Sequence, residues 1–261
     1  MRYFAIYFLL SSALLFGTKA ESFDHSHSAW SDELDRYLDK KTGLVDYKQW
    51  HGTYKIEKKG VLADYLTSLS AIPIRTFESW TVNQQKAFLV NAYNSLTIKL
   101  ILDHFPVKSI KKIGGFLTKP WDIDFFKILD GKITSLDSIE HEYLRKIPKY
   151  KDPRIHAAVN CASISCPRLW HEAFVASKLD QQLDDAARTW LRDSTRNRYD
   201  LKTQKIEISK IFDWFEEDFG NSSKGVIAFI KAYGPEEIAK KLSDQADISY
   251  LDYNWQLNIK S

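Results

Sequence analysis

Hydrophobic residues recur at helical spacing along most of the chain. The longest such stretch, residues 81–105, is apolar on most sides, starts at a capping residue (Thr81 or Asn83) and stops before Pro106. It predicts a long central helix. Shorter amphipathic stretches predict further helices over residues 30–38, 60–72, 177–193, 224–234 and 235–244.

A few short stretches have the alternating pattern of strands. Residues 121–147 indicate a strand, an Asp-Gly turn, a strand and a helix, and residues 202–220 indicate a strand followed by a helix. Residues 152–161 alternate β-branched and other side chains, which predicts another strand, and residues 247–260 close the chain as a strand. Because these strands are scattered among helices, we predict a helix-rich α+β fold with a small, mostly antiparallel sheet.

Two amides interrupt the apolar surface of the predicted central helix. Asn91 and Asn94 are three positions apart and therefore share one face of that helix. An unpaired buried polar group costs roughly 1–3 kcal/mol, so each amide needs a hydrogen-bond partner. We expect them to tie a loop or a site to the helix rather than to take part in chemistry.

Residues 1–20 have the pattern of an export signal. Arg2 precedes an apolar run from residue 3 to residue 16, and small side chains occupy the positions before a cut at Glu21. The run is shorter than the roughly 20 residues of a membrane span, although an uncleaved anchor is an alternative. We predict a secreted or periplasmic protein with no membrane span after cleavage. Its N-terminal helical segment, residues 21–79, would pack on a core formed by residues 80–261.

The charge balance excludes one class of partner. Without residues 1–20 the chain has 35 basic and 34 acidic residues, and no strong basic patch stands out. A nucleic-acid-binding surface would show a clustered basic excess, so no nucleic acid is expected as a partner. No motif for a cofactor is present, and we expect none.

The two cysteines of the chain are Cys161 and Cys166. Pro167 follows at once, and proline favours the first position of a helix, which would place Cys166 at a helix N-terminus. The backbone N–H groups and the dipole there would lower the thiol pKa and favour a nucleophilic thiolate. A disulfide staple is the second interpretation, because exported proteins pair spare thiols. A zinc site that recruits His141 or His156 is the third, although the spacing lacks a C-x₂-C pair.

Five segments that occur in order resemble the domain of unknown function 547 family, over residues 80–258 or so. They are "FLVNAYNSLTIKLIL", "SLDSIEHEYLR", "DPRIHAAVNCASISCPRLW", "LDQQLDDAARTWL" and "YLDYNWQLN". The resemblance implies a site in which the "IEH", "RIH" and "SCP" segments supply Glu140, His156 and Cys166, with Cys161 close by. That trio is similar to the Glu-His-Cys arrangement of papain- and transglutaminase-like hydrolases, with the nucleophile last in the chain instead of first.

Roles follow from this arrangement. His156 would take the proton of Cys166, and Glu140 would orient the imidazole ring. Asn91, Asn94 and His141 would lie next to these groups and hold them in position without contacting the substrate. Arg154 and Arg168 flank the site; they would either bind a substrate carboxylate or be ordinary surface charges.

The sequence therefore predicts an exported cysteine hydrolase or acyltransferase that acts on an amide or ester bond. Its substrate would be a protein or peptide of the cell envelope, an expectation that rests on localisation alone. Two rival hypotheses stay open. One is a non-enzymatic interaction module with a Cys161–Cys166 disulfide, and the other is a zinc-binding site.

Overall fold

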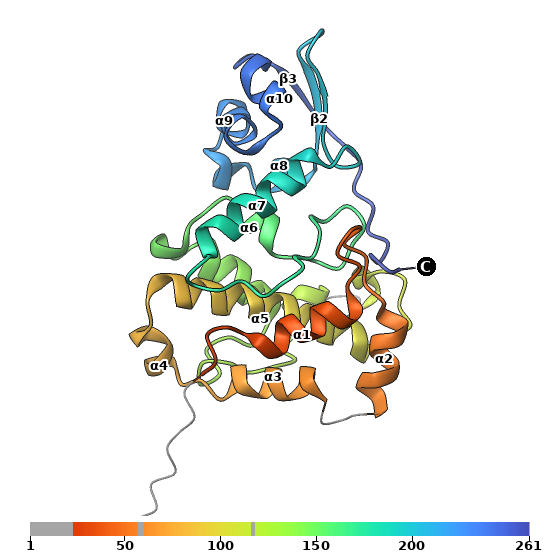
Figure 1. The fold of residues 1–261 in the computed structure, drawn as a ribbon, viewed down its shortest axis with the longest axis vertical. Coiled ribbons are helices and arrows are strands. Elements are labelled where there is room, and N and C mark those ends of the chain that lie inside the picture. Colours follow the sequence, from red (N-terminus) through yellow and green to blue (C-terminus); the bar gives the residue numbers. More distant parts are fainter. Residues whose placement is uncertain (1–22, 57–59, 116–117, 261) are drawn as a thin grey trace, which may run out of the picture.

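Helix α5 (Val82–Asp103) lies at the centre of the fold and is buried along most of its length (Figure 1). The structure is a computed structural model and describes residues 23–56, 60–115 and 118–260. The Thr81 hydroxyl accepts a hydrogen bond from the Gln84 N–H, and the Gln84 side chain accepts one from the Thr81 N–H, which completes a capping box. The predicted central helix and its Thr81 cap are confirmed.

Four N-terminal helices pack next to α5 and share its hydrophobic core. Within that core the ring centroids of Tyr37 and Trp50 are 4.7 Å apart, and those of Trp30 and Trp50 are 6.0 Å apart. Such aromatic pairs contribute about 0.5–1.5 kcal/mol each beyond the area they bury. The four helices are α1 (Ser28–Tyr37), α2 (Tyr47–Ile56), α3 (Val61–Ser70) and α4 (Ile74–Ser79).

A second hydrophobic core lies beyond α5, in the C-terminal part of the chain. Its centre is the stacked pair Trp190 and Phe212, with ring centroids 4.6 Å apart and planes 6° apart. The helices around it are α7 (Leu179–Arg192), α8 (Ile211–Trp214), α9 (Ser223–Tyr233) and α10 (Glu236–Lys241). The fold therefore has two packed regions, one around α5 and one around the Trp190–Phe212 pair.

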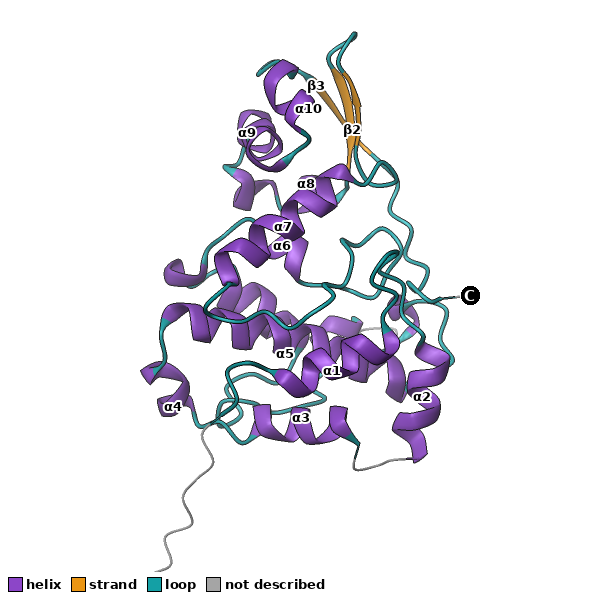
Figure 2. Ribbon diagram, in the orientation of Figure 1, coloured by secondary structure: helices purple, strands orange, loops and turns teal. Residues whose placement is uncertain are grey.

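A small sheet lies at the far end of this second region (Figure 2). It has the order β1-β2-β3, from β1 (Arg198–Asp200), β2 (Lys205–Ile208) and β3 (Asp247–Tyr250). β1 pairs with β2 antiparallel, but β2 pairs with β3 parallel. The α+β class is thus confirmed, whereas the sheet is mixed and not mostly antiparallel. The long helical excursion between β2 and β3 brings β3 back in the direction of β2, which an antiparallel hairpin would not.

Three local predictions were wrong. The expected hairpin near residues 123–134 is reduced to a single bridge between Ile128 and Ile133. Residues 152–161 do not form a strand but contain the short helix α6 (Ile155–Ala158). Residues 166–174 do not form a helix. Their backbone groups are satisfied by other elements instead, because Ala173 N–H donates to the Ser31 hydroxyl and Phe174 N–H donates to the Asn91 side chain.

Short helical turns complete the architecture. The 3₁₀ turns are η1 (Ile110–Lys112), η2 (Pro120–Asp122), η4 (Pro148–Tyr150) and η5 (Glu216–Phe219), and a π-helix is η3 (Ser138–Leu144). Two of them, η2 and η3, line the cavity described below, and η5 carries Asp218, which binds the lining residue His156.

The C-terminal segment connects the two packed regions. After β3 the chain runs back to α2 (Figure 1), where the Leu257 N–H donates to the Lys108 carbonyl and the Asn258 carbonyl accepts from the Val45 N–H. Within the described residues, no helix combines the length and apolar character that a membrane span requires. The predicted export signal, residues 1–20, lies outside the described residues.

Candidate active site

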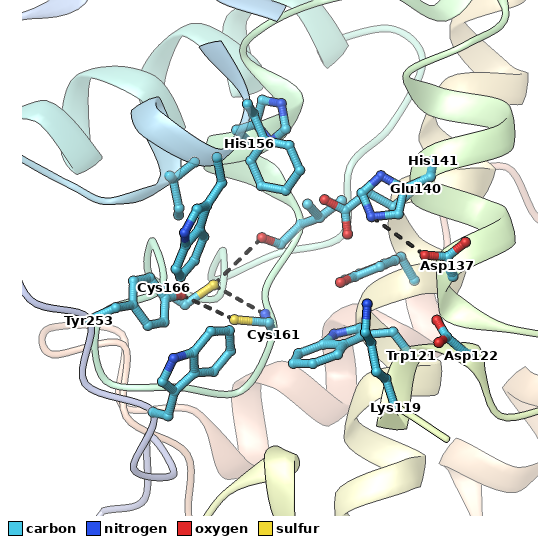
Figure 3. A pocket seen from close by; sticks show the side chains of 16 residues that line it. Lys119, Trp121, Asp122, Asp137, Glu140, His141, His156, Cys161, Cys166 and Tyr253 are labelled. Atoms are coloured by element: carbon cyan, nitrogen blue, oxygen red, sulfur yellow. Dashed lines mark hydrogen bonds and ion pairs between the residues drawn. The ribbon is translucent and has the colours of Figure 1, made fainter. Parts of the chain in front are cut away.

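A cavity of about 290 Å³ opens where the two packed regions meet. Ligand sites commonly occur between such units, and this one combines aromatic walls with several polar groups (Figure 3). Its lining comes from α5, η2, η3, α6, the loop after α6 that carries both cysteines, α8 and the C-terminal segment. The lining residues are Tyr93, Lys119, Trp121, Asp122, Asp137, Glu140, His141, His156, Val159, Cys161, Cys166, Ile211, Trp214, Phe215, Tyr253 and Trp255.

The loop that carries both cysteines is held by two buried asparagines. The Asn94 side chain, on α5, accepts from the Asn160 N–H at 2.8 Å and donates to the Ala158 carbonyl at 2.9 Å. Asn160 in turn accepts from the Ala162 N–H at 2.8 Å and donates to the Pro167 carbonyl at 2.7 Å. Ala162 has a φ of 57°, a left-handed conformation that is uncommon for a residue with a side chain. Tertiary hydrogen bonds thus hold an unfavourable turn directly after Cys161.

Two more side chains fix neighbouring parts of this segment. Arg196 donates to the carbonyls of Ile164 and Cys166, at 2.5 and 2.7 Å. Asn91 donates to the Phe174 carbonyl at 2.7 Å and accepts from the Phe174 N–H at 2.9 Å. Asn91 and Asn94 therefore connect loops to the central helix, and neither lines the cavity.

Cys161 presents its sulfur to the cavity and is half-buried. Its Sγ lies 3.2 Å from the Tyr253 hydroxyl and 3.2 Å from the Ser163 hydroxyl. A hydrogen bond from the Cys166 thiol is the largest influence on the Cys161 pKa, and with the two hydroxyls it lowers that pKa below the usual value. Burial and the nearby Glu140 carboxylate act in the opposite direction and are outweighed.

Cys166 lies deeper, with 3% of its surface exposed. No helix starts at Pro167, so the expected dipole and free N–H groups are missing, and burial raises the Cys166 pKa well above its usual value. The Sγ accepts a hydrogen bond from the Cys161 N–H at 3.1 Å. The predicted helix N-terminus at Cys166 is therefore absent, and this geometry favours Cys161 as the activated thiol. The identity of the nucleophile stays a prediction. Both cysteines are free thiols in the structure.

His156 contacts a different carboxylate from the one expected. Its Nε2 lies 2.8 Å from Asp218 Oδ2, and its ring stacks on Phe215 with centroids 4.4 Å apart. Burial raises the Asp218 pKa, but hydrogen bonds from His156 and Arg145 outweigh it and lower that pKa overall. Among the described residues, no hydrogen bond joins His156 to either cysteine. The Glu140–His156–Cys166 triad is therefore not assembled, because Asp218 occupies the place assigned to Glu140.

Glu140 and His141 both line the cavity, although they are adjacent in sequence. An α-helix would turn one of them away, but residues 138–144 form a π-helix, in which Arg145 N–H donates to the Glu140 carbonyl five positions earlier. Wider π-turns of this kind are frequent at functional sites. The Tyr93 hydroxyl is hydrogen-bonded to the Glu140 side chain, and burial first, then Glu140, raises the Tyr93 pKa well above its usual value.

Arg145 connects the two cavity histidines. Its Nη1 lies 2.7 Å from His141 Nδ1, and its Nε is bound to Asp218, which holds His156. Arginine has only donors, so His141 Nδ1 must accept, and the ring proton is on Nε2, 3.6 Å from Asp137 Oδ1. Sequence reasoning missed Arg145 and Asp218, which lies 62 positions from His156 and has no motif to mark it.

The two arginines expected to receive a substrate carboxylate are engaged elsewhere, and neither lines the cavity. Arg154 is bound to Asp152, Asp180 and Asp184, and the hydrogen bond to Asp152 is the main reason that its pKa is raised. The Arg168 guanidinium donates to the Lys41 carbonyl at 2.6 Å. Both guanidinium groups contact protein acceptors, and Arg168 Nε is buried with no hydrogen-bond partner among the described residues. Their substrate-binding role stays a prediction.

The zinc hypothesis finds no ligand set in the described part of the chain. Within it, no group of three or more His, Cys, Asp or Glu side chains is arranged to hold a metal ion. His141 and His156 are bound to Arg145 and Asp218 instead of facing the two sulfurs.

Several of the remaining cavity residues that sequence reasoning overlooked are aromatic. Tyr253 and Trp255 belong to the segment "YLDYNWQLN", so the motif marked them without indicating what they do. Trp214 is 42% exposed, and it is one of the few large apolar side chains in the described residues that are so open to solvent.

Comparison with known protein families found a match. A family described as "Protein of unknown function, DUF547" matches residues 77–191, which include α5, η3, α6 and both cysteines but not Asp218 or Tyr253. The comparison with curated proteins and the comparison with solved structures each found no match. Over residues 77–191 the chain thus matches the DUF547 family, which supports the resemblance found in the sequence.

Proposed function

We propose that this protein is an exported cysteine-dependent hydrolase or acyltransferase that acts on an amide or ester bond with Cys161 as its nucleophile. The observation that carries the proposal is the environment of one sulfur. Cys161 Sγ opens into a cavity, contacts the hydroxyls of Tyr253 and Ser163, and has a lowered pKa. The thiolate is the nucleophilic form of cysteine, so each of these features favours attack.

Glu140 is the group best placed to carry the proton. Its carboxylate lines the same cavity and interacts electrostatically with Cys161 (Figure 3). In the proposed reaction the Cys161 thiol gives its proton to Glu140, and the thiolate attacks the carbonyl carbon. The new C–S bond displaces an amine or alcohol, which leaves with the proton from Glu140.

The resulting thioester is then opened by a second nucleophile. Water gives its proton to Glu140, the C–S bond breaks, and the proton returns to the sulfur as the acid product leaves. In an acyltransferase an amine or alcohol takes the place of water. His156 has no direct part in these steps, because its Nε2 is bound to Asp218 and no hydrogen bond joins it to either cysteine among the described residues.

Acyl-enzyme trapping tests this proposal. The full-length protein is mixed with p-nitrophenyl acetate, and intact mass and p-nitrophenolate release are followed. Cys161→Ala and Cys166→Ala are a matched pair, since each removes one thiol from the same loop. We expect one acetyl group on wild type and on Cys166→Ala, and none on Cys161→Ala.

Two comparisons make the result specific. The same protein unfolded in urea gives the rate of an ordinary thiol, which the native protein should exceed by about tenfold or more if its thiolate is activated. Equal acetylation of the folded Cys161→Ala variant would reject Cys161 as nucleophile. A folded wild type that reacts no faster than the unfolded chain would favour the non-enzymatic interaction module.

A further inference from the structure

One wall of the cavity is a continuous group of aromatic rings. Tyr253 and Trp255 have ring centroids 4.5 Å apart, and Trp214 lies 4.8 Å from Tyr253. Trp214 also stacks on Trp255 with planes 22° apart, and Trp121 contacts Trp255 edge-on at 5.6 Å. These four residues, the aromatic wall, come from η2, α8 and the C-terminal segment. Three separate parts of the chain thus meet to place ring faces around one space.

The other side of the cavity is acidic (Figure 3). Asp122, Asp137 and Glu140 line it, and among the described lining residues Lys119 is the single lysine or arginine. Three carboxylates against one ammonium leave the cavity with an excess of two negative charges, before any charge on Cys161. A cavity with low-dielectric walls and one sign of charge concentrates ligands of the opposite sign.

Rings at this site already attract cations of the protein itself. Lys111 Nζ lies 4.9 Å from the ring centroid of Trp255, and the Arg145 guanidinium lies 4.6 Å from that of Phe215. Neither Lys111 nor Arg145 lines the cavity. The attraction arises from the negative face of each ring, and it is strongest for tryptophan.

A neutral sugar would also stack on tryptophan, but it would leave the charge of the opposite wall without compensation. An organic ammonium group satisfies both walls at once, because its alkyl groups contact ring faces while its charge faces the carboxylates. Aromatic side chains combined with acidic ones are a recurrent way to bind such cations.

We propose that this cavity binds an organic ammonium group, placed between the aromatic wall and the carboxylates of Asp122 and Asp137. This inference rests on the proposed acyl-transfer function, since it names the substrate class of the same site. The substrate is then an amide or ester with an ammonium group close to the bond that Cys161 attacks.

Calorimetric titration of the full-length protein with a matched pair of probes tests the inference. Choline carries the charge, and 3,3-dimethylbutan-1-ol has the same shape without it. We expect choline to bind about tenfold more tightly than the alcohol at low ionic strength. Added salt should weaken choline binding and leave the alcohol unaffected.

Variants locate the binding site. Asp122→Asn and Trp214→Leu should each weaken choline binding about threefold to tenfold. Glu142→Gln is the control, because Glu142 is an exposed acid next to the lining residue His141 but does not itself line the cavity. It removes the same charge, and its affinity should stay within about twofold of wild type.

The following results would overturn the inference that the cavity binds an ammonium group. Equal affinity for choline and the alcohol, or binding of N-acetylglucosamine without binding of choline, would overturn the inference and favour a neutral ligand. Equal losses in Asp122→Asn and Glu142→Gln would also contradict it. Choline binding by Cys161→Ser separates this inference from the proposed function. If that variant and wild type bind choline alike while wild type forms no acyl-enzyme, the cation site stands and the acyl-transfer function fails.

Discussion

The Cys161 sulfur and the Tyr253 hydroxyl oxygen are 3.2 Å apart, although 92 positions separate them in the chain. Burial, and then the charge of Cys161, raises the Tyr253 pKa well above its usual value, so the phenol keeps its proton. The Ser163 hydroxyl lies 3.1 Å from the Tyr253 oxygen and 3.2 Å from the sulfur, and it can donate its one hydrogen to either. When Tyr253 accepts from Ser163, its own O–H is free to donate to the sulfur. The C-terminal segment therefore completes the surroundings of the Cys161 sulfur that the cysteine loop begins.

Tyr253→Phe tests this contact. Loss of the donor should raise the Cys161 pKa and slow alkylation of Cys161 at pH 7 by about tenfold, the effect of one hydrogen bond to a charged group. The pH–rate profile of iodoacetamide labelling measures the change, and its midpoint should move to higher pH. Tyr250→Phe is the control, because Tyr250 does not line the cavity and is not among the described hydrogen-bond partners of the Cys161 sulfur. A profile unchanged in Tyr253→Phe would show that the hydroxyl does not stabilise the thiolate.

Glu140→Gln should have opposite effects on thiol reactivity and on turnover. The Glu140 carboxylate raises the Cys161 pKa, so removing its charge should lower that pKa and speed alkylation at pH 6 by about two- to fivefold. Acyl transfer should fall at the same time, because the proton carrier is lost. The amide oxygen can still accept from Tyr93, which limits the structural effect. If alkylation slows instead, Glu140 supports the thiolate, as the original triad hypothesis requires.

Periodicity predicted the elements whose stability is local. The helix over residues 82–103 has its own cap and an uninterrupted apolar pattern, and both were visible in the sequence. The segment around Cys166 behaves differently. Its backbone is satisfied by Asn91 and Ser31, side chains far away in the sequence, so the helix that Pro167 suggested does not form. The sequence of residues 166–174 does not predict these long-range hydrogen bonds.

In the candidate site, too, the sequence predicted local features but not the contacts between distant segments. The motifs identified the lining residues Glu140, His156 and Cys161, but not which of them touch. The partner of His156 is Asp218, from a segment without a motif. The relative acidity of the two thiols depends on burial and on Tyr253, which only the fold brings together. Sequence spacing alone therefore pointed to Cys166, whereas the contacts in the fold favour Cys161.

The buried amide of Asn94 should be important for stability. Asn94→Ala leaves the Asn160 N–H and the Ala158 carbonyl without their partners in the interior, which should lower the free energy of unfolding by about 2–4 kcal/mol. Urea denaturation measures this. Ser95→Ala is the control on the same helix, because the Ser95 hydroxyl bonds only to carbonyls of its own helix; its cost should stay below about 1 kcal/mol. Equal costs would mean that Asn94 does not anchor the loop.

The Asp218 network should make stability depend on pH in the acid range. The Asp218 pKa is lowered in the folded state, so its contribution is complete above the unfolded value of about 3.9 and is lost as pH falls through the folded pKa. Asp218→Asn should reduce the free energy of unfolding at pH 7 by about 1–3 kcal/mol. That difference from wild type should shrink below about pH 4.

Urea denaturation at pH 7 and at pH 3 measures both parts of this prediction. Asp213→Asn, an exposed acid on α8, is the control and should change stability at pH 7 by less than about 0.5 kcal/mol. A difference between wild type and Asp218→Asn that is the same at pH 7 and pH 3 would contradict the role of the carboxylate.

The most direct test of Cys161 as the activated thiol is the order in which the two cysteines react. Reduced wild-type protein is labelled with iodoacetamide at pH 7 and quenched over time, and fragment-ion mass spectrometry assigns the label, since one tryptic peptide between Arg154 and Arg168 holds both cysteines. Cys161 should react at least about tenfold faster than Cys166, and Cys166 should approach its rate only when the chain is unfolded. Labelling of Cys166 first in the folded protein, or equal rates at both positions, would contradict the account.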